Sequence, residues 1–349
     1  MKNRRPFSFR LSAIVLLSFF PLLLFSQETS TCAENLKEAQ NQFDKGHVEL
    51  ISGLLGECMK SGFKSDEQLS AYKLLLQASL FEDKLKEADS SMLSFLKRYP
   101  EYQLSPTDHS SFVNLFNSFK VKSFLQLSVH LGLNLPMVTV SKQVSLSMQP
   151  KPATYTTSIG NFYGSVEAKI PLNKKFEVNI EGALSQVKFT KTEDFLTFSK
   201  VNYIETQQRF ELPLSVTWNI TEFGKLTPFV RAGFGPALTL SSTAKPSDIP
   251  FDLSSSELHT GADISRTDSR FFINMFAQAG AGIKYKIPRG FLNLEVRFNP
   301  GLQTQPDYGG DSQQSLDYTY YYKDDVFFLS TLNFSVGYTY IFYKSSKRK

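Results

Sequence analysis

The feature that most constrains this chain is an alternation of apolar and polar residues with a period of two. Between Leu125 and Leu135 the odd positions are all leucine or valine, and the even positions are polar or small. Side chains of a β-strand point alternately to its two faces, so one face of this segment is aliphatic and the other is polar. Such a strand fits between lipid on one side and a barrel interior on the other.

The same alternation returns seven more times before the C-terminus. The segments are 162–170, 176–184, 210–220, 230–240, 273–285, 292–298 and 332–342. The connections at 171–175, 221–225 and 288–290 are short, and those at about 141–158, 187–205, 241–270 and 303–327 are long. Short periplasmic turns and long outer loops are typical of outer-membrane barrels. A soluble β-sandwich is the alternative, but its strands would be shorter, at about 5–6 residues. The sequence therefore predicts a mainly β chain with an eight-stranded antiparallel transmembrane β-barrel over residues 121–343, in contact with outer-membrane lipid.

The two ends of the chain carry basic residues. Residues 1–26 combine Lys2, Arg4 and Arg5 with the apolar run 11–25. This run is shorter than the ~20 residues that a membrane-spanning helix needs, so we expect a signal peptide that is removed after Ser26. Residues 344–349 form a basic C-terminal tail. We expect this tail to contact anionic lipid head groups or a partner, with a solvated tail as the alternative.

Residues 27–120 have apolar residues at helical spacing and are predicted to form a small periplasmic α-helical domain. The stretch from Leu69 to Pro100 resembles a tetratricopeptide (TPR) repeat, carried by Tyr72, Leu75 and Ala88. This resemblance implies a module that binds a peptide or a partner. The alternative is that the apolar stripe is only the core of the domain itself.

Cys32 and Cys58 are the only cysteines of the chain. In an oxidising compartment such a pair indicates a disulfide. It would join the start of the first predicted helix to the end of the second. The competing metal or redox site lacks both a CxxC spacing and a nearby group of histidines.

The polar faces of the predicted strands carry five acidic and five basic residues. They are Glu167, Glu177, Glu181, Glu211, Glu295, Lys169, Arg231, Lys284, Lys286 and Arg297. Buried charges are tolerated when they are paired and hydrogen-bonded, and an eight-stranded barrel has an interior that side chains just fill. We therefore expect a paired network and a closed lumen. An ion or proton path along this network is the functional alternative.

No catalytic constellation is visible in the sequence. The histidines are His47, His109, His130 and His259, and only His130 falls in a predicted strand. No phosphate-binding loop precedes a helix and no metal-ligand cluster occurs. A net charge of +5 does not indicate a nucleic-acid partner. The sequence therefore predicts no enzyme, no cofactor and no metal site.

Two aromatic segments are candidates for contact with other proteins. The last predicted strand contains Ser335, Gly337, Tyr338, Tyr340 and Phe342. It resembles the C-terminal signal by which the barrel-assembly machinery recognises outer-membrane barrels. The second segment is a tyrosine-rich loop, and tyrosine is favoured at binding surfaces. Its tyrosines are Tyr318, Tyr320, Tyr321 and Tyr322. The alternative for this loop is an aromatic girdle or a strand extension.

The exported chain as a whole resembles the PorT-like outer-membrane barrel proteins of Bacteroidota, in forms with an N-terminal helical domain. The resemblance is carried by the Cys32–Cys58 hairpin and by segments at 71–75, 81–83, 99–102, 210–214 and 227–233. Members of that class include accessory components of the type IX secretion and gliding apparatus. The resemblance therefore implies a non-enzymatic accessory or scaffold subunit of an outer-membrane complex for secretion or barrel assembly, with protein partners at the helical domain and the loops.

Two other functions stay open at this point. One is a stand-alone structural or adhesive barrel that binds ligands through its long extracellular loops. The other is an enzyme that acts on envelope lipids, in which His130 would be the required base.

Overall fold

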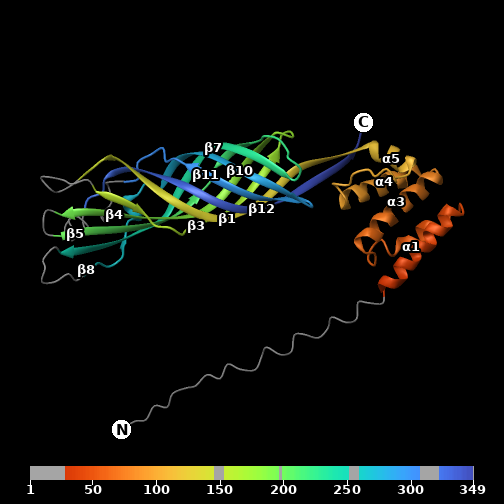
Figure 1. The fold of residues 1–349 in the computed structure, drawn as a ribbon, viewed down its shortest axis with the longest axis horizontal. Coiled ribbons are helices and arrows are strands. Elements are labelled where there is room, and N and C mark those ends of the chain that lie inside the picture. Colours follow the sequence, from red (N-terminus) through yellow and green to blue (C-terminus); the bar gives the residue numbers. More distant parts are fainter. Residues whose placement is uncertain (1–27, 145–152, 196–198, 251–258, 307–321, 349) are drawn as a thin grey trace, which may run out of the picture. The chain divides into compact units, whose positions relative to one another are not determined.

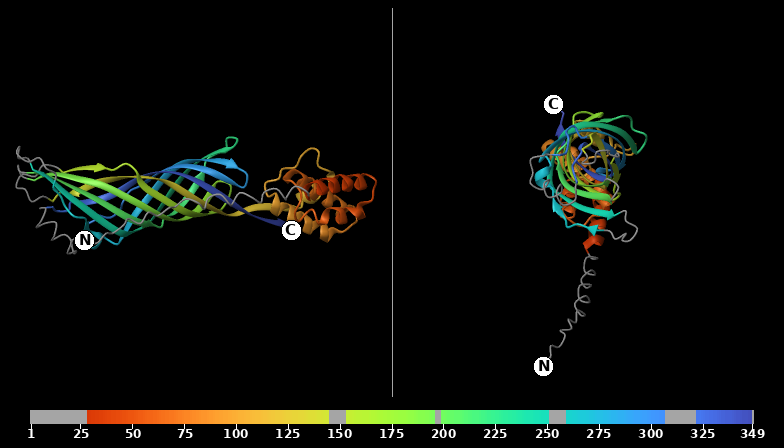
Figure 2. Two further views of the ribbon diagram at one scale, coloured as in Figure 1. Left: turned by 90° about the horizontal axis from the view of Figure 1, so that it is seen from below. Right: turned by 90° about the vertical axis from the view of Figure 1, so that its left-hand side faces the viewer.

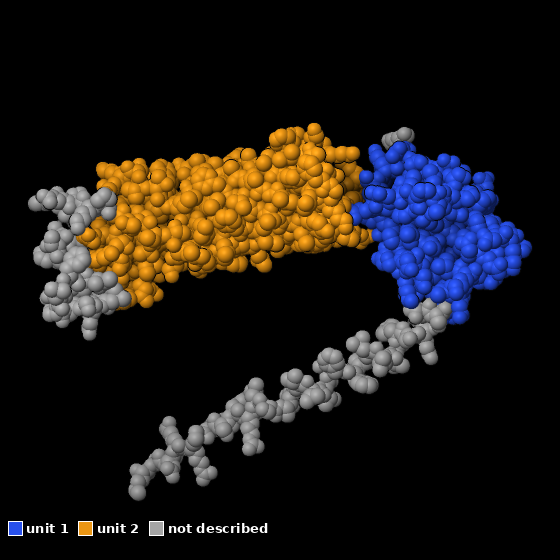
Figure 3. All heavy atoms as spheres, in the orientation of Figure 1, with its two compact units in different colours: residues 1–121, 345–349 blue, residues 122–344 orange. Residues whose placement is uncertain are grey.

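The computed structural model describes residues 28–144, 153–195, 199–250, 259–306 and 322–348, so the expected signal peptide lies outside the described residues. The chain divides into two compact units (Figure 3). Unit 1 comprises residues 1–121 together with 345–349, and unit 2 comprises residues 122–344.

Unit 1 is helical, and Figure 1 labels its helices α1, α3, α4 and α5. Its helical elements are α1 (Glu28–Asp44), the 3₁₀ turn η1 (Val48–Leu50), α2 (Ile51–Gly56), α3 (Ser65–Phe81), α4 (Leu85–Arg98) and α5 (Ser110–Asn117). None of the described helices combines the length and the apolar character that crossing a membrane requires.

Two apolar clusters hold the helices of unit 1 together. In the first, Ala39 of α1 and Ile51 of α2 pack against the α3 residues Ala71 and Leu74. The other face of α3 contributes Leu76 to the second cluster. That cluster also contains Met92, Phe95, Leu96, Phe112 and Phe119. Helix α3 therefore packs on both sides, and the first residue of β1 is part of the helical core.

Unit 2 is a single antiparallel sheet. Its strands are β1 (Phe119–Lys142), β2 (Thr154–Thr157), β3 (Asn161–Pro171), β4 (Phe176–Phe195), β5 (Ser199–Glu211), β6 (Leu214–Asn219), β7 (Leu226–Pro250), β8 (His259–Thr260), β9 (Ile264–Ser265), β10 (Ile273–Ile287), β11 (Gly290–Asn299) and β12 (Val326–Lys347). A 3₁₀ turn, η2 (Thr267–Ser269), precedes β10.

The pairing of the long strands returns to its starting point. The order runs β10-β11-β12-β1-β3-β4-β5-β7, and β7 also pairs with β10. The β7–β10 register extends from Leu226↔Tyr285 to Leu238↔Ile273. The strands therefore wind around a common interior (Figure 2). Strand β6 continues the path of β5 after Leu212 and Pro213, between β4 and β7.

The two faces of these strands differ as the period-two pattern predicts. Leu131 is 61% exposed on the outside, whereas the neighbouring His130 is fully buried on the inside. The outer face includes residues that are each between 56% and 60% exposed, namely Val166, Ile180, Phe234, Leu294 and Val336. An apolar exterior around a polar interior is the inverse of a soluble sandwich, in which the apolar faces meet.

Two predicted loops are wrong. The expected connection at about 241–270 begins as strand, because β7 continues to Pro250 and pairs there with β5. Residues 187–205 were expected to form a long connection, but β4 continues to Phe195 and β5 begins at Ser199, with pairing from Ala183↔Glu211 to Phe195↔Ser199. The apolar exterior of β4 ends at Leu184, and the next outward residues are Gln186, Lys188, Thr190 and Thr192. Because both faces contain polar residues in this region, the alternation that revealed the other strands is lost. We call the zone in which the outward side chains are apolar the apolar belt. Strands β4 and β5 extend beyond it by roughly ten residues, or about 33 Å along the strand.

The C-terminal residues also differ from the expected separate tail. Strand β12 continues to Lys347, and residues 345–349 belong to unit 1. The backbone N–H of Arg348 donates to the carbonyl of Ser118 at 2.7 Å. The ammonium of Lys347 contacts the Asp89 carboxylate of α4. The basic end of the chain is therefore anchored on the helical unit by these contacts.

Candidate functional site

A network of buried charges occupies the interior of unit 2. Strand geometry places these residues there, because their positions alternate with the apolar outer face. Arg297 of β11 donates to both carboxylate oxygens of Glu181 of β4, at 2.7 and 2.8 Å. Its other terminal nitrogen lies 2.7 Å from Glu295. The hydroxyl of Tyr163 also donates to Glu181, at 2.6 Å.

Arg231 of β7 links this arrangement to one further carboxylate, that of Glu167. Its guanidinium lies 2.6 Å from Glu167 and 3.0 Å from Glu295. Glu167 further contacts Lys169 and the Nε2 atom of His130, both at 3.2 Å. The membrane-level network is therefore Glu167, Lys169, Glu181, Arg231, Glu295 and Arg297, with His130 at its edge. Three carboxylates face three cations, and all are at most 3% exposed.

The other four predicted interior charges lie outside this network. Glu177 and Lys284 form a separate pair at 2.7 Å, with Asn219 bonded to both. Glu211 is buried and accepts a hydrogen bond from Ser185 at 2.7 Å. Lys286 is half-buried, and its ammonium lies 5.2 Å from the centre of the Phe291 ring.

A second buried cluster, which the sequence analysis missed, lies in the part of the strands beyond the apolar belt. Glu205 of β5 contacts Arg270 with both carboxylate oxygens, at 2.8 and 2.5 Å. Asp324 contacts Arg270 at 2.7 Å and also pairs with Arg266. All four residues were assigned to loops, where charged residues are usually solvated. The period-two spacing with Arg209 and Glu211 is a signal for Glu205 alone, and the alternation gives none for the other three residues.

The residues of the expected assembly signal lie on β12. Tyr338 and Phe342 are exposed on the outer face, and Tyr340 is half-buried. Ser335 and Gly337 face the interior. A Cβ atom at Gly337 would lie 2.4 Å from Nδ1 of the buried His130, so β1 and β12 can approach this closely only because residue 337 is glycine.

The tyrosine-rich loop is only partly described. Tyr318, Tyr320 and Tyr321 lie outside the described residues. Tyr322 is only 4% exposed, and its ring stacks on Tyr203 at 3.8 Å between centroids. Tyr322 therefore contributes to the interior, contrary to the exposed partner surface that was predicted.

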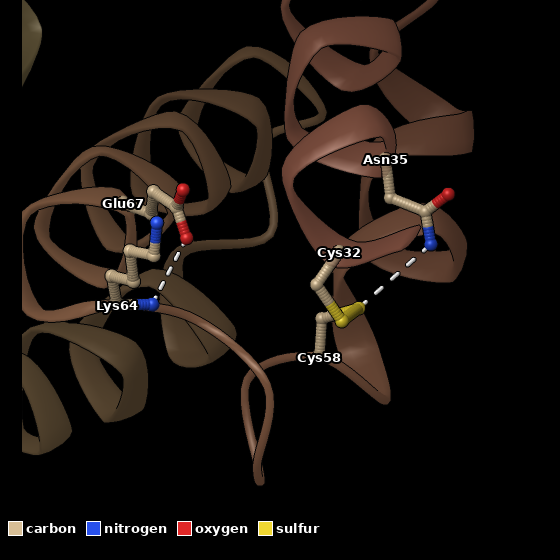
Figure 4. The surroundings of a disulfide bond; sticks show 5 residues. All are labelled: Cys32, Asn35, Cys58, Lys64 and Glu67. Carbon is tan, nitrogen blue, oxygen red and sulfur yellow. Dashed lines mark hydrogen bonds between the residues drawn. A yellow bond between two sulfur atoms is a disulfide. The ribbon is translucent and has the colours of Figure 1, made fainter. Parts of the chain in front are cut away.

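The expected disulfide joins the start of α1 to the segment after α2 (Figure 4). The Cα atoms of Cys32 and Cys58 lie 5.6 Å apart. Gly62 adopts a φ of +131° beside this bond, and a Cβ atom there would lie 2.7 Å from the sulfur of Cys32. The next helix, α3, begins with a hydrogen bond from the Lys64 N–H to the Glu67 carboxylate at 2.9 Å. The disulfide thus fixes the two helices that precede α3.

A polar cluster ties α3 to the segment before α5. The Asp108 carboxylate accepts hydrogen bonds from the Lys73 ammonium at 2.6 Å and from the Tyr102 hydroxyl and Ser105 N–H at 2.7 Å. Partial burial acts to raise the pKa of Asp108, but these hydrogen bonds outweigh it and hold the pKa below its usual value. The same contacts raise the pKa of Lys73 against the opposing effect of its burial.

This cluster predicts an acid-sensitive helical unit. A carboxylate with a lowered pKa in the folded state stabilises that state above its unfolded pKa of ~3.9, and the contribution is lost as the pH falls through the folded pKa. We expect the helical circular-dichroism signal of the full chain to melt at a lower temperature at about pH 3 than at about pH 6. Asp108→Asn should reduce this difference. Glu34→Gln, which removes an exposed carboxylate of α1, is the control and should leave the difference unchanged.

The buried charges of the described interior residues are arranged in pairs and small networks. Among the described residues, no group of three or more His, Cys, Asp or Glu side chains could hold a metal ion. His130, the histidine weighed as a base, is fully buried and contacts Glu167. In this position its ring fills the space between β1, β3 and β12.

Comparison with known proteins gives one family match. The family model for the outer membrane protein beta-barrel domain matches residues 105–304. Comparison with curated proteins gives no match. Among solved structures, Neisserial surface protein A is similar, with 11% identity, a TM-score of 0.34, and coverage of 64% of this chain and 99% of that chain. The outer-membrane protease OmpT of Escherichia coli has 9% identity, a TM-score of 0.35 and coverages of 63% and 97%. OprG of Pseudomonas aeruginosa has 9% identity and a TM-score of 0.32, and the match covers 63% of this chain and 97% of OprG.

Proposed function

Since this chain belongs to the family of outer-membrane protein β-barrel domains, we propose that it is a closed, non-enzymatic barrel that serves as an accessory subunit of a larger outer-membrane complex. The complex would act in protein secretion or in barrel assembly. The barrel would anchor the helical unit in the periplasm and present it to partner proteins.

The observation that carries the proposal is the buried, charge-paired interior. An eight-stranded barrel, with β5 and β6 counted as one interrupted strand, has an interior that side chains just fill. The membrane-level network contacts side chains from β3, β4, β7 and β11, with His130 from β1. Charges bound in this way leave the interior unsuited to conduct ions. A barrel without a pore or a reactive site has its remaining surfaces available for partners.

The periplasmic position of the helical unit is proposed from the direction of the strands. The short connections, between β3 and β4, β6 and β7, and β10 and β11, lie at one end of the sheet. Short turns are periplasmic in outer-membrane barrels. Strand β1 starts at that end and leads away from it, and β12 returns to it. Both termini of the barrel would therefore emerge on the periplasmic side.

The partner-binding role of the helical unit is proposed from the α3–α4 hairpin. It contains the residues that resemble a tetratricopeptide repeat, and Pro100 follows the end of α4. Phe81 and Leu85, at the turn of this hairpin, are 58% and 59% exposed. Large apolar side chains left in water at a turn favour contact with another protein. The resemblance to PorT-like proteins points in the same direction.

Two measurements test the proposal. Pure protein in planar bilayers should give no steady single-channel conductance, and a reproducible conductance would overturn the closed lumen. Gentle extraction from native membranes followed by pull-down should recover partner proteins with the full chain, and also with a variant that lacks residues 251–258. A variant that lacks residues 28–117 should lose those partners while its barrel still assembles. Recovery of the full chain as a lone monomer in several mild detergents would count against the accessory role.

A second candidate function is an adhesive barrel that binds extracellular ligands. It is favoured by the extension of β4, β5 and β7 beyond the apolar belt, where the outward residues are polar. This function predicts the opposite deletion result: ligand binding would need the extended strands and loops, and the helical unit would be dispensable.

A further inference from the structure

The segment Tyr322–Asp325, directly before β12, is buried although it belongs to no strand or helix. Tyr322 is 4% exposed, Asp324 2% and Asp325 not at all. The segment lies at the end of the barrel that bears the long connections. A connection at that end would normally be solvated, because its backbone groups lack ladder partners. Its burial therefore requires specific contacts.

The Asp324 carboxylate provides the central contact. It accepts hydrogen bonds from Arg270 at 2.7 and 3.1 Å and pairs with Arg266. Glu205 of β5 holds the other side of the Arg270 guanidinium. Two carboxylates thus balance two guanidinium groups, and each of the four residues is at most 2% exposed.

The flanking residues are bound to other strands. The ring of Tyr322 stacks on Tyr203 of β5. The Asp325 carboxylate accepts hydrogen bonds from the Val144 N–H and the Tyr155 hydroxyl, both at 2.7 Å, and lies 3.1 Å from the Lys191 ammonium. Lys191 also donates to the carbonyl of Lys323 at 2.9 Å. Every residue of the segment is therefore held by a part of the chain distant in sequence.

We infer that Tyr322–Asp325 is a latch that seals the long-connection end of the barrel interior, separately from the membrane-level network. That this end is extracellular rests on the proposed orientation. Among the described residues, Tyr322–Asp325 form no ladder pair of their own, so the latch can leave the interior without unpairing the described strands. Release exposes Ala244, which packs against Tyr203 and Tyr322. It also exposes polar groups such as Gln207, whose buried Oε1 has no hydrogen-bond partner among the described residues.

Thiol labelling tests the latch, because the two native cysteines are joined and an introduced cysteine is the only free thiol. Ala244→Cys in the full-length barrel should react slowly with a charged, membrane-impermeant thiol reagent. Adding Asp324→Asn should raise the rate by about tenfold or more, since breaking a buried ion pair shifts the open–closed equilibrium by at least that factor. Adding Asp263→Asn, which removes an exposed charge from the connection that carries Arg266 and Arg270, should leave the rate unchanged.

Two further cysteines separate the latch from the proposed closed lumen. Thr243→Cys, on the outer face, should react fast in every background. Ser335 is the strand-register partner of Glu295, at the level of the membrane-level network. Ser335→Cys should react slowly with the thiol reagent in every background. Rapid labelling of Ser335→Cys in an otherwise native chain would overturn the closed lumen and leave the latch untouched. Rapid labelling of Ala244→Cys in that chain would overturn the latch.

A second latch variant covers the case in which Asp324→Asn prevents folding. Tyr322→Ala removes the ring stacked on Tyr203 and leaves the charges of Asp324 and Arg270 paired. It should also raise the labelling rate of Ala244→Cys. An unchanged rate in both folded variants, or in Tyr322→Ala alone if Asp324→Asn does not fold, would overturn the inference.

Discussion

Replacing Arg297 with alanine should lower the free energy of unfolding of the barrel by roughly 3–5 kcal/mol, the usual effect of removing one partner of a buried ion pair. The substitution leaves Glu181 and Glu295 in the interior without their shared partner, and Tyr163 loses its contact with the guanidinium. Arg231 remains, but it already pairs with Glu167 and lies 3.5 Å from Glu181. The uncompensated negative charge accounts for most of the loss.

Trp218 gives a direct readout of this effect. It is the only tryptophan of the chain and lies 45% exposed on the outer face of β6, where we expect it to contact lipid in the folded barrel. Its emission should shift to longer wavelength when urea unfolds the protein from lipid vesicles. The transition of Arg297→Ala should occur at a lower urea concentration than that of the wild type.

Two variants distinguish the loss of buried ion pairs from a general loss of barrel stability. Lys174→Ala removes a cation from the exposed turn after β3 and should leave the transition unchanged. Combining Arg297→Met with Glu181→Gln leaves two carboxylates, Glu167 and Glu295, facing two cations, Lys169 and Arg231, and should recover much of the stability. If Arg297→Ala matched the wild type, the network would not hold the interior together, and the closed-lumen proposal would lose its basis.

Removing the disulfide should destabilise the helical unit and leave the barrel unaffected. Cys32 and Cys58 are 26 positions apart, and for a loop of this length the chain-entropy treatment gives about 3.5 kcal/mol. Cys32→Ser combined with Cys58→Ser should therefore lower the melting temperature of the helical circular-dichroism signal. The effect is expected to be large because the unit has two small cores.

The barrel signal serves as the internal control for this prediction. The Trp218 emission change in urea should be the same in the wild type and the double variant, because both cysteines lie in unit 1. Wild-type protein treated with a reductant should reproduce the helical loss. Equal melting temperatures with and without the disulfide would contradict the stabilising role assigned to it.

The strands within the apolar belt could be predicted because lipid imposes an apolar exterior. Wherever a strand has lipid on one face, as from Leu125 to Leu135, the period of two is visible in the sequence. Above the belt this constraint disappears. Residues such as Lys188 and Thr206 face outward where the belt has ended, so the continuation of β4 and β5 could not be distinguished from a loop.

The sequence by itself determined which residues of the strands within the apolar belt face inward, because alternation along each strand is a local property. It also determined the cysteine pair, since Cys32 and Cys58 have no other possible partners within the chain. Only the tertiary structure decided which charges meet. Arg297 and Glu181 are 116 residues apart, and their contact depends on the register of every strand around the closed sheet. The burial of Asp324 likewise required Arg266, Arg270 and Glu205 to come together, because a charge in a connection is buried only where its partners are already in place.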